Sequence, residues 1–472
     1  MRTVILRENE PYSIEYLSRL FQCSNEQVIQ YLKSLGLMNI VKHINKTWNI
    51  DLNDFLDVDS IDSDTLNLEK GVYLFTYVGM FLIDGACIIV YPKYLKNYRK
   101  DKYNGYKDLK QIVEVIIKYQ ANKQDFGGDT NDGKEYFNIL SLTLDLFDNY
   151  YKYGLYRNEM DISEINGYGQ ILWNRTMNYS IPYIKENRPI YFDYYTSKKV
   201  NNFDDFFHRL HACLLTEISD NLNDILLILE VEPLKLSNEK LNDFGDVDHI
   251  IQLINQELSQ QFVTSRHNTL KLIKSYFEKS YTYNQSDVVS LVGTGSFHNI
   301  WEEACSVVLN NNFDDTLIDL KLTYKKTHYS TKISKIVEQP KWYYSRDEAP
   351  HLANKTLIPD IISINNEEKT FSIYDAKYYQ IILNDEQVAK QPGIADITKQ
   401  YLYELAYKEF MVENKLSMKE NAFLMPTDED EKKIIGYVSL DMFRALDEIK
   451  SKSIKIILLP TRKIYADYLR ST

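Results

Sequence analysis

One strand–turn–strand pattern constrains the fold of this chain more than any other feature. Two apolar segments, Leu357–Ile364 and Thr370–Tyr378, lie on either side of a polar turn at residues 365–369. Short apolar runs separated by a polar turn are typical of a β-hairpin. The sequence therefore predicts an antiparallel hairpin in the last third of the chain.

Three charged residues of this hairpin, Asp360, Asp375 and Lys377, are expected to lie close together. With the turn centred between residues 367 and 368, Asp360 lies opposite Asp375, and their carboxylates can share a cation. Side chains alternate along a strand, so Asp375 and Lys377 project from one face, while the Ala376 carbonyl is available as a further ligand. Carboxylates suit Mg²⁺, and an ammonium can stabilise charge that develops on a phosphate. We expect Mg²⁺-dependent phosphodiester hydrolysis, the alternative being a surface hairpin with an ion pair.

An upstream segment supplies a candidate for a further carboxylate. Residues 297–305 have apolar side chains at helical spacing, and Glu302 and Glu303 flank the apolar face. That face comprises Phe297, Trp301, Ala304, Cys305 and Val308. We take Glu302 as the catalytic residue and metal ligand of this helix, although both glutamates could simply be solvated.

A downstream helix is expected over residues 396–405. Lys399 and Gln400 lie four and three residues before Tyr403, and spacings of three and four share a helical face, so these side chains could reach phosphate oxygens. We assign Gln400 to the catalytic site. For Tyr403, packing in the core is an equally good interpretation.

A basic stretch precedes the hairpin in an otherwise acidic chain. The 472 residues carry a net charge of −12, so contact with nucleic acid requires a local basic patch or a partner. Lys321–Arg346 contains seven Lys or Arg against one Glu, with tyrosines and Trp342 between them. We expect phosphate binding there, the alternative being an exposed strand pair with ordinary lysines.

The first fifty residues have a helix-turn-helix pattern. Two helices are expected at residues 13–21 and 25–35, with Ser24 capping the second, followed by a small wing from Ile40-Val41 and Thr47–Ile50. Base recognition would use Asn25, Gln27, Gln30 and Lys33. Because Met1–Ile50 carries only six Lys or Arg against four Glu, a winged helix that serves packing or protein contacts is an equal alternative.

The middle of the chain mixes strand and helix signals. After an acidic linker at Asp51–Asp64, two apolar runs around Asp84-Gly85 predict a hairpin that stops at Pro92. A helix is expected over residues 109–119 and mainly helical structure over 201–280. Residues 128–135 imitate a phosphate-binding loop, but Glu135 replaces the required Ser or Thr, and the preceding residues 121–125 are too polar for a buried strand.

The composition indicates a cytoplasmic protein of three domains. The four cysteines lie apart, and no apolar run is long enough to span a membrane or resembles a signal peptide. His208, His211 and Cys213 lie close together on one expected helix, where packing is favoured over zinc binding.

We predict an α/β (α+β) chain with a winged-helix-like domain at 1–65, a mixed middle domain at 66–290 and a nuclease domain at 291–472.

The order of these features resembles the PD-(D/E)xK nuclease superfamily and, more widely, the LlaJI restriction endonucleases, relatives of the McrC subunit of McrBC systems. Four segments besides the catalytic hairpin carry this resemblance. They are Val78-Gly79 with Tyr91–Tyr94, Gly169–Trp173 with Arg175-Thr176, Phe297–Glu302, and Pro392–Gln400.

The resemblance implies roles for particular residues and partners. Asp360, Asp375 and Glu302 would hold Mg²⁺, and Lys377 would act at the scissile phosphate of double-stranded DNA. Gln400 and Tyr403 resemble the Gln-Tyr signature of RecB-like nucleases, except that the usual position of the tyrosine holds Glu404.

A McrB-like AAA+ GTPase would recognise and translocate DNA, and a DNA methyltransferase of the same system is a further expected partner. The rival interpretations are a stand-alone resolvase or RecB-like repair nuclease, and an inactive winged-helix scaffold.

Overall fold

The computed structural model describes residues 2–37, 41–44, 72–83, 86–96, 102–125, 139–283, 288–344, 349–383, 388–444, 449–451 and 453–471. The chain forms two compact units, Asn138–Gln285 and a larger unit of Arg2–Phe137 with Ser286–Thr472. The predicted linker at 51–64 and boundary at residue 65 lie outside the described residues, and the predicted boundary near residue 290 stays a prediction. No described helix is both long and apolar enough to cross a membrane.

A four-stranded sheet forms the amino-terminal part of the larger unit. Its order is β1 (Arg2–Arg7), β6 (Ala86–Tyr91), β5 (Val78–Ile83) and β12 (Val288–Thr294), and only β1 and β6 run parallel. Strands β5 and β6 form the predicted hairpin, and β6 ends before Pro92 as expected. The Asp84-Gly85 turn lies outside the described residues.

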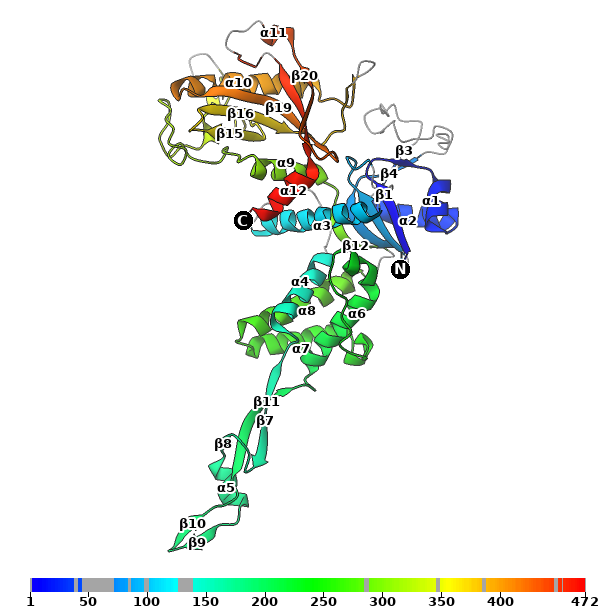
Figure 1. Cartoon of the computed structure of the whole chain (residues 1–472), viewed down its shortest axis with the longest axis vertical. Coiled ribbons are helices and arrows are strands. Elements are labelled where there is room, and N and C mark those ends of the chain that lie inside the picture. Colours follow the sequence, from blue (N-terminus) through cyan, green and yellow to red (C-terminus); the bar gives the residue numbers. More distant parts are fainter. Residues whose placement is uncertain are drawn as a thin grey trace. The chain divides into compact units, whose positions relative to one another are not determined.

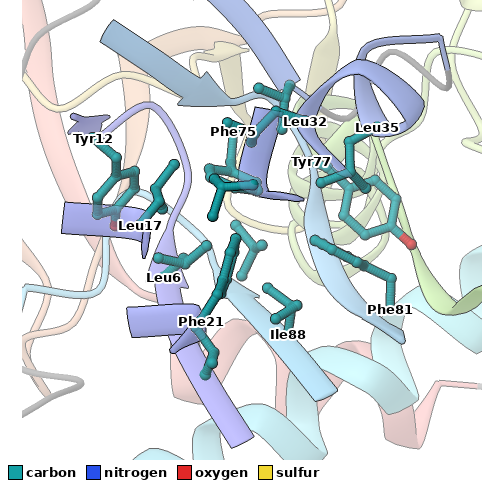
Figure 2. Close-up of a cluster of buried hydrophobic side chains, with 14 residues drawn as sticks. Leu6, Tyr12, Leu17, Phe21, Leu32, Leu35, Phe75, Tyr77, Phe81 and Ile88 are labelled. Atoms are coloured by element: carbon teal, nitrogen blue, oxygen red, sulfur yellow. The ribbon is translucent and has the colours of Figure 1, made fainter. Parts of the chain in front are cut away.

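Two short helices pack beside this sheet, as the sequence predicts. They are α1 (Ile14–Phe21) and α2 (Asn25–Leu37). Ser24 caps α2 in a reciprocal arrangement: its hydroxyl accepts from the Gln27 amide, and the Gln27 side chain accepts from the Ser24 amide. Figure 2 shows the shared core, in which side chains from α1 and α2 meet Phe75, Phe81 and Ile88 of the strands.

The strand after α2 pairs differently from the predicted wing. Strand β3 (Val41–Ile44) lies beside β4 (Val72–Phe75), and β2 (Pro11–Tyr12) completes a three-stranded sheet. The predicted partner, Thr47–Ile50, lies outside the described residues. The assignment to the winged-helix class stays a prediction.

Glycines allow two of these strands to approach closely. Gly79 has a φ of 143°, and a Cβ there would lie 2.1 Å from the carbonyl oxygen of Val292. Opposite it, a Cβ on Gly293 would overlap the ring of Tyr77. The β5–β12 contact therefore requires glycine at both positions.

Helix α3 (Lys102–Asp125) joins this sheet to the carboxy-terminal part of the same unit. It includes the predicted helix at 109–119, and residues 121–125, which are too polar for a buried strand, form its last turn. It packs against β12, α9 (Phe297–Val308) and α12 (Thr461–Arg470). Residues 128–135 lie outside the described residues.

The carboxy-terminal sheet has five strands in the order β15 (Ile361–Asn365), β16 (Thr370–Ala376), β19 (Ser417–Thr427), β21 (Ile454–Pro460) and β20 (Lys433–Val438). The three central strands are parallel, and the two outer pairings are antiparallel. In Figure 1, α10 (Ile394–Glu413) covers one side, and α9 and α12 lie on the other. The predicted helices at 297–305 and 396–405 are thus confirmed.

Short elements complete this part of the chain. They are the 3-10 helix η6 (Ile333–Lys335), the pairs β13 (Lys341–Trp342) with β14 (His351–Leu352) and β17 (Ile382–Leu383) with β18 (Val388–Ala389), and helix α11 (Asp441–Arg444).

The smaller unit is mainly helical, as the sequence predicts for residues 201–280. It contains α4 (Ile139–Tyr153), α6 (Phe206–Ile228), α7 (Val247–Gln260) and α8 (Thr264–Tyr283), with the 3-10 helix η5 (Leu241–Phe244). Leu222 interrupts the helical backbone of α6 and puts a kink in this long helix.

The three adjacent His and Cys side chains of α6 pack against backbone groups. His211 is buried and accepts from the Tyr156 amide at 3.1 Å, and Nδ1 of His208 lies 2.7 Å from the Tyr156 carbonyl. The Cys213 thiol donates to the Glu239 carbonyl. These contacts correspond to the packing role that we expected.

An elongated arm extends from these helices (Figure 1). Its stem is the antiparallel pair β7 (Asn158–Ile165) and β11 (Tyr195–Asn202), with β8 (Gln170–Ile171) beside β11. Beyond the stem lie α5 (Trp173–Tyr179) and the hairpin β9 (Tyr183–Lys185) with β10 (Arg188–Ile190). Glu186 and Asn187 both have positive φ, the conformation of a tight two-residue hairpin turn.

Candidate active site

The hairpin that carries the candidate residues forms in the register expected from the sequence. Ile361 lies opposite Tyr374, which is the pairing obtained by centring the turn between residues 367 and 368. Strand β15 begins later than predicted, so Asp360 lies in a bend just before it. The register still brings Asp360 to the end of β16, beside Asp375.

A side chain from outside the hairpin holds Asp360 in place. The amide of Asn311 donates to the Asp360 carbonyl at 3.0 Å and accepts from the backbone amide of Ile362 at 3.0 Å. Because β15 is an edge strand, these bonds satisfy backbone groups that no neighbouring strand reaches. In addition, the Asp360 carboxylate accepts from the Ala376 amide at 3.1 Å.

The carboxylates of Asp360 and Asp375 repel each other in a poorly solvated site. Burial, followed by the charges of Asp375 and Glu302, raises the pKa of Asp360 well above its usual range. A hydrogen bond between the two carboxyl groups acts in the same direction. A cation placed between them would replace the shared proton and relieve this repulsion.

Lys377 lies on the same side as Asp375, as strand alternation requires. Its Nζ is 3.0 Å from Asp375 Oδ1 and 3.3 Å from Asp396 Oδ1. Burial lowers the pKa of Lys377, but the neighbouring carboxylates outweigh this effect and raise it above its usual value. The lysine therefore stays an ammonium, with its direction fixed by two acidic partners.

Asp396 belongs to the candidate site through its contact with Lys377, although no sequence pattern indicated a role for it. It lies in the first turn of α10, after Gly393. An acidic residue at the start of a helix is favoured by the helix dipole alone, so its position did not distinguish it from an ordinary surface residue. Its contact with Lys377 joins α10 to the chain just after β16.

The two glutamates of α9 have different environments. Glu303 accepts from the hydroxyl of Tyr468 at 2.6 Å and from the Asn122 amide, which gives it a packing role. Glu302 lies close enough to Asp360 for its charge to raise the pKa of that group. The indole of Trp301 donates to the Leu424 carbonyl of β19 and holds α9 against the sheet.

Two of the three polar candidates on α10 are buried. Gln400 is fully buried, and both of its amide atoms lack a hydrogen-bond partner among the described residues. Tyr403 is buried and donates to the Ile358 carbonyl at 2.8 Å, so the packing interpretation accounts for its contacts. Lys399 is exposed.

Glu404, at the position that the RecB-like signature gives to tyrosine, is buried. Its carboxylate accepts from the amides of Lys450 and Ser451 and from the Asn421 side chain. It therefore anchors the segment before β21.

The basic stretch is partly neutralised by acidic neighbours. Lys326, Lys332 and Lys341 pair with Glu409, Asp314 and Glu338, respectively. Its exposed aromatic side chains are Tyr329, Trp342, Tyr343 and Tyr344, whereas Tyr324 packs in the core against Phe410. Arg346 lies outside the described residues.

The amino-terminal candidates for base contact lie on the solvent side of α2. Asn25, Gln27, Gln30 and Lys33 are exposed. Gln27 also takes part in the capping contact with Ser24. Their role in base recognition stays a prediction.

The donor set at Asp360 and Asp375 is compatible with Mg²⁺. Among the described residues, no group of three or more His, Cys, Asp or Glu side chains is gathered closely enough to hold a metal ion by itself. Mg²⁺, however, is commonly held by one or two carboxylates, with water and substrate phosphate as the remaining ligands. Two facing carboxylates next to an ammonium fit that requirement, and Glu302 and the Ala376 carbonyl stay predicted ligands.

One sequence relative and two solved structures are similar to this chain. A Bacillus subtilis (strain 168) protein described as Type II restriction enzyme BsuMI component YdjA is 25% identical over 415 residues, which cover 85% of this chain and 82% of that protein. A Thermococcus gammatolerans structure, a half-complex of McrB AAA+ hexamers with bound McrC, covers 99% of both chains at 13% identity with a TM-score of 0.39. A cryo-EM structure of the McrBC complex of the same organism covers 66% of this chain and 88% of the other, at 12% identity and a TM-score of 0.27.

The family comparison covers every candidate of the carboxy-terminal site. The model of the LlaJI restriction endonucleases matches residues 77–459. Asp360, Asp375, Lys377, Glu302 and Gln400 all lie within this range. Because the match extends over most of the sequence, the chain belongs to the LlaJI restriction endonuclease family.

Proposed function

We propose that this chain is the DNA-cutting subunit of a restriction system and that it hydrolyses phosphodiester bonds of double-stranded DNA with Mg²⁺. The observation that carries the proposal is the meeting of Asp360, Asp375 and Lys377 at one end of the hairpin. We interpret the five-stranded sheet with α9 and α10 as a PD-(D/E)xK nuclease core. Membership of a restriction endonuclease family supports the same activity.

Asp360 and Asp375 would hold the metal ion, with Glu302 and the Ala376 carbonyl as further ligands. When bound, Mg²⁺ supplies Lewis-acid stabilisation of the phosphate and lowers the pKa of water. Lys377 remains protonated, so it donates hydrogen bonds to a phosphate oxygen or to the attacking water and does not remove a proton. Its ion pairs with Asp375 and Asp396 keep the ammonium oriented before DNA binds.

The subunit would act together with a McrB-like AAA+ GTPase. A net charge of −12 disfavours DNA binding by the chain alone, and the curated relative is itself described as a component of a restriction enzyme. The arm offers a surface for a protein partner because large apolar side chains on it are exposed. They include Tyr168, Tyr179, Ile181, Tyr183, Ile184 and Phe192. A methyltransferase of the same system stays a prediction.

A cleavage assay tests the proposal. The full chain is incubated with unmethylated and methylated DNA and Mg²⁺, with and without GTP and a McrB-like AAA+ protein from the same organism. We expect cleavage that needs Mg²⁺, GTP and the partner. Full-rate cleavage by the chain alone would favour the stand-alone repair nuclease, and no cleavage with all components would favour the inactive scaffold.

A further inference from the structure

The chain that follows the catalytic strand is tied to the amino-terminal sheet. Strand β16 ends at Ala376, and residues 377–381 belong to no helix or strand. Within this segment Tyr378 is buried, and its hydroxyl donates to the carboxylate of Glu8 at 2.6 Å. Glu8 directly follows β1, so residues far apart in the sequence meet beside the candidate site.

A second set of contacts reinforces this connection. The same carboxylate oxygen of Glu8 accepts from the backbone amide of Lys93 at 3.2 Å. The Lys93 ammonium lies 4.5 Å from the centre of the Tyr378 ring, and the Gln380 side chain donates to the Lys93 carbonyl. Two residues that follow Lys377 are therefore held by the ends of β1 and β6.

Aromatic packing extends the connection to the helix that carries Glu302. The Tyr378 ring lies 6.2 Å from that of Tyr94 and 5.6 Å from that of Phe297, measured between ring centres. Phe297 is the first residue of α9, and Tyr94 follows β6. One buried cluster thus contacts the segment that follows Lys377 and the helix that carries Glu302.

We propose that Glu8 is a positioning residue of the nuclease, which holds Tyr378 and thereby fixes Lys377 at the scissile phosphate. Backbone pairing alone leaves this segment weakly constrained, because after β16 the described ladder continues only through the Lys377 amide, which donates to the Leu424 carbonyl. A displacement of about 1 Å in a reacting group can cost about a hundredfold in rate. The amino-terminal sheet is therefore part of the cutting machinery. This inference rests on the proposed nuclease function.

Hydrogen exchange and cleavage kinetics on the full chain test the proposal. Glu8→Ala removes the acceptor, Tyr378→Phe removes the donor but keeps the ring, and Glu8→Gln keeps an acceptor. Glu10→Ala is the matched control, because Glu10 contacts Tyr12 and Arg7 of the same sheet region and has no contact with Tyr378 among those the structure gives.

We expect Glu8→Ala and Tyr378→Phe to raise amide exchange in residues 377–383 by about tenfold or more. In the presence of the partner, kcat should fall about ten- to hundredfold while KM for DNA stays within about twofold. The double variant should be no worse than either single variant. Glu8→Gln and Glu10→Ala should behave like the unaltered chain.

Unchanged exchange and kcat in Glu8→Ala would overturn the proposal, and so would an equal loss in Glu10→Ala. If the unaltered chain did not cleave DNA, the proposed function would fail. The exchange measurement would still decide whether Glu8 holds the segment after Lys377, because it needs no activity.

Discussion

At the scale of single residues, the site combines two carboxylates that repel each other with an ammonium that attracts both. Asp375→Asn removes one charge while keeping the shape of the side chain. We expect cleavage to fall by about a thousandfold, since a preorganised electrostatic group can contribute that much. Mg²⁺ should raise the melting temperature of the unaltered chain but not of the variant, because a ligand stabilises only the state that binds it.

Without metal, Asp375→Asn loses both the repulsion with Asp360 and the ion pair with Lys377, so its melting temperature should stay close to that of the unaltered chain. Thermal melts with and without Mg²⁺ measure both effects. Asp441→Asn is a control at an exposed position of the same part of the chain. A variant that still cleaved at the normal rate would contradict the assignment of Asp375.

Gln400 is a polar side chain in a position that stability alone does not explain. Burying an amide without hydrogen bonds costs about 1–3 kcal/mol in proteins. Gln400→Leu should therefore leave the free energy of unfolding unchanged or raise it by about 1 kcal/mol, while cleavage is lost. Urea unfolding and the cleavage assay give the two readouts, and a variant that is less stable but fully active would assign Gln400 a packing role.

The sequence was sufficient for part of this site because strand pairing follows simple geometry. The position of the turn determined that Asp360 lies beside Asp375, and alternation placed Lys377 with Asp375. Asn311 and Asp396 could not be found in this way. Their contacts depend on how a loop and a helix pack against the sheet, which no local pattern encodes.

At the scale of elements, α6 contains a buried histidine that should make the helical unit sensitive to acid. Burial, with a smaller effect from His208, lowers the pKa of His211 from 6.5 to about 4. The unfolded chain takes up this proton near pH 6.5 and the folded chain only near pH 4, so stability is lost as the pH falls between these values. The full loss is about 3 kcal/mol.

This prediction can be measured by urea unfolding of the full chain, with amide exchange in α6 reporting on the helical unit. His211→Gln keeps a polar group of similar size that does not titrate, so its stability should vary less between pH 6.5 and pH 4. His249→Gln, at an exposed position of α7, should retain the pH dependence of the unaltered chain. Identical profiles for all three proteins would contradict the argument.

The arm was not foreseen because its strands lack the usual signal. Strand β11 is mostly polar, and in β7 the alternation of polar and apolar residues covers only Glu159–Ser163, so the pair as a whole lacks the usual strand signal. The arm is defined instead by long-range pairing and by glycines in tight places. A Cβ on Gly169, for example, would lie 2.3 Å from the Ser197 carbonyl oxygen.

The proposed role of the arm predicts a variant that folds but does not respond to its partner. Ile181 is 91% exposed, so Ile181→Ser should leave the melting temperature unchanged. Binding of the AAA+ partner should weaken by about tenfold or more, as expected for an apolar contact at the centre of an interface. Phe262→Ser is the control, because Phe262 is 92% exposed in the same unit but lies outside the arm. Equal affinities for the two variants would refute this surface.

At the scale of the whole molecule, charge limits how the chain can meet DNA. The 67 acidic residues outnumber the 55 basic ones, so attraction must come from local groups. In the basic stretch, Lys326 and Lys332 are engaged by carboxylates. Lys325 and Lys335 are exposed, and the structure gives their side chains no ion pair among the described residues. Lys325 and Lys335 are therefore the better candidates for phosphate contacts.

This distinction predicts the salt dependence of DNA binding by the full chain. Each neutralised phosphate contributes about 0.9 to the slope of log affinity against log salt concentration. Replacing both Lys325 and Lys335 by alanine should therefore reduce the slope by about 2. Replacing Lys326 and Lys332 by alanine should leave the slope nearly unchanged. The affinity for DNA should fall, because the carboxylates of Glu409 and Asp314 lose their basic partners. If the second pair lowered the slope as much as the first, phosphate contact would depend on total charge rather than on the unpaired lysines.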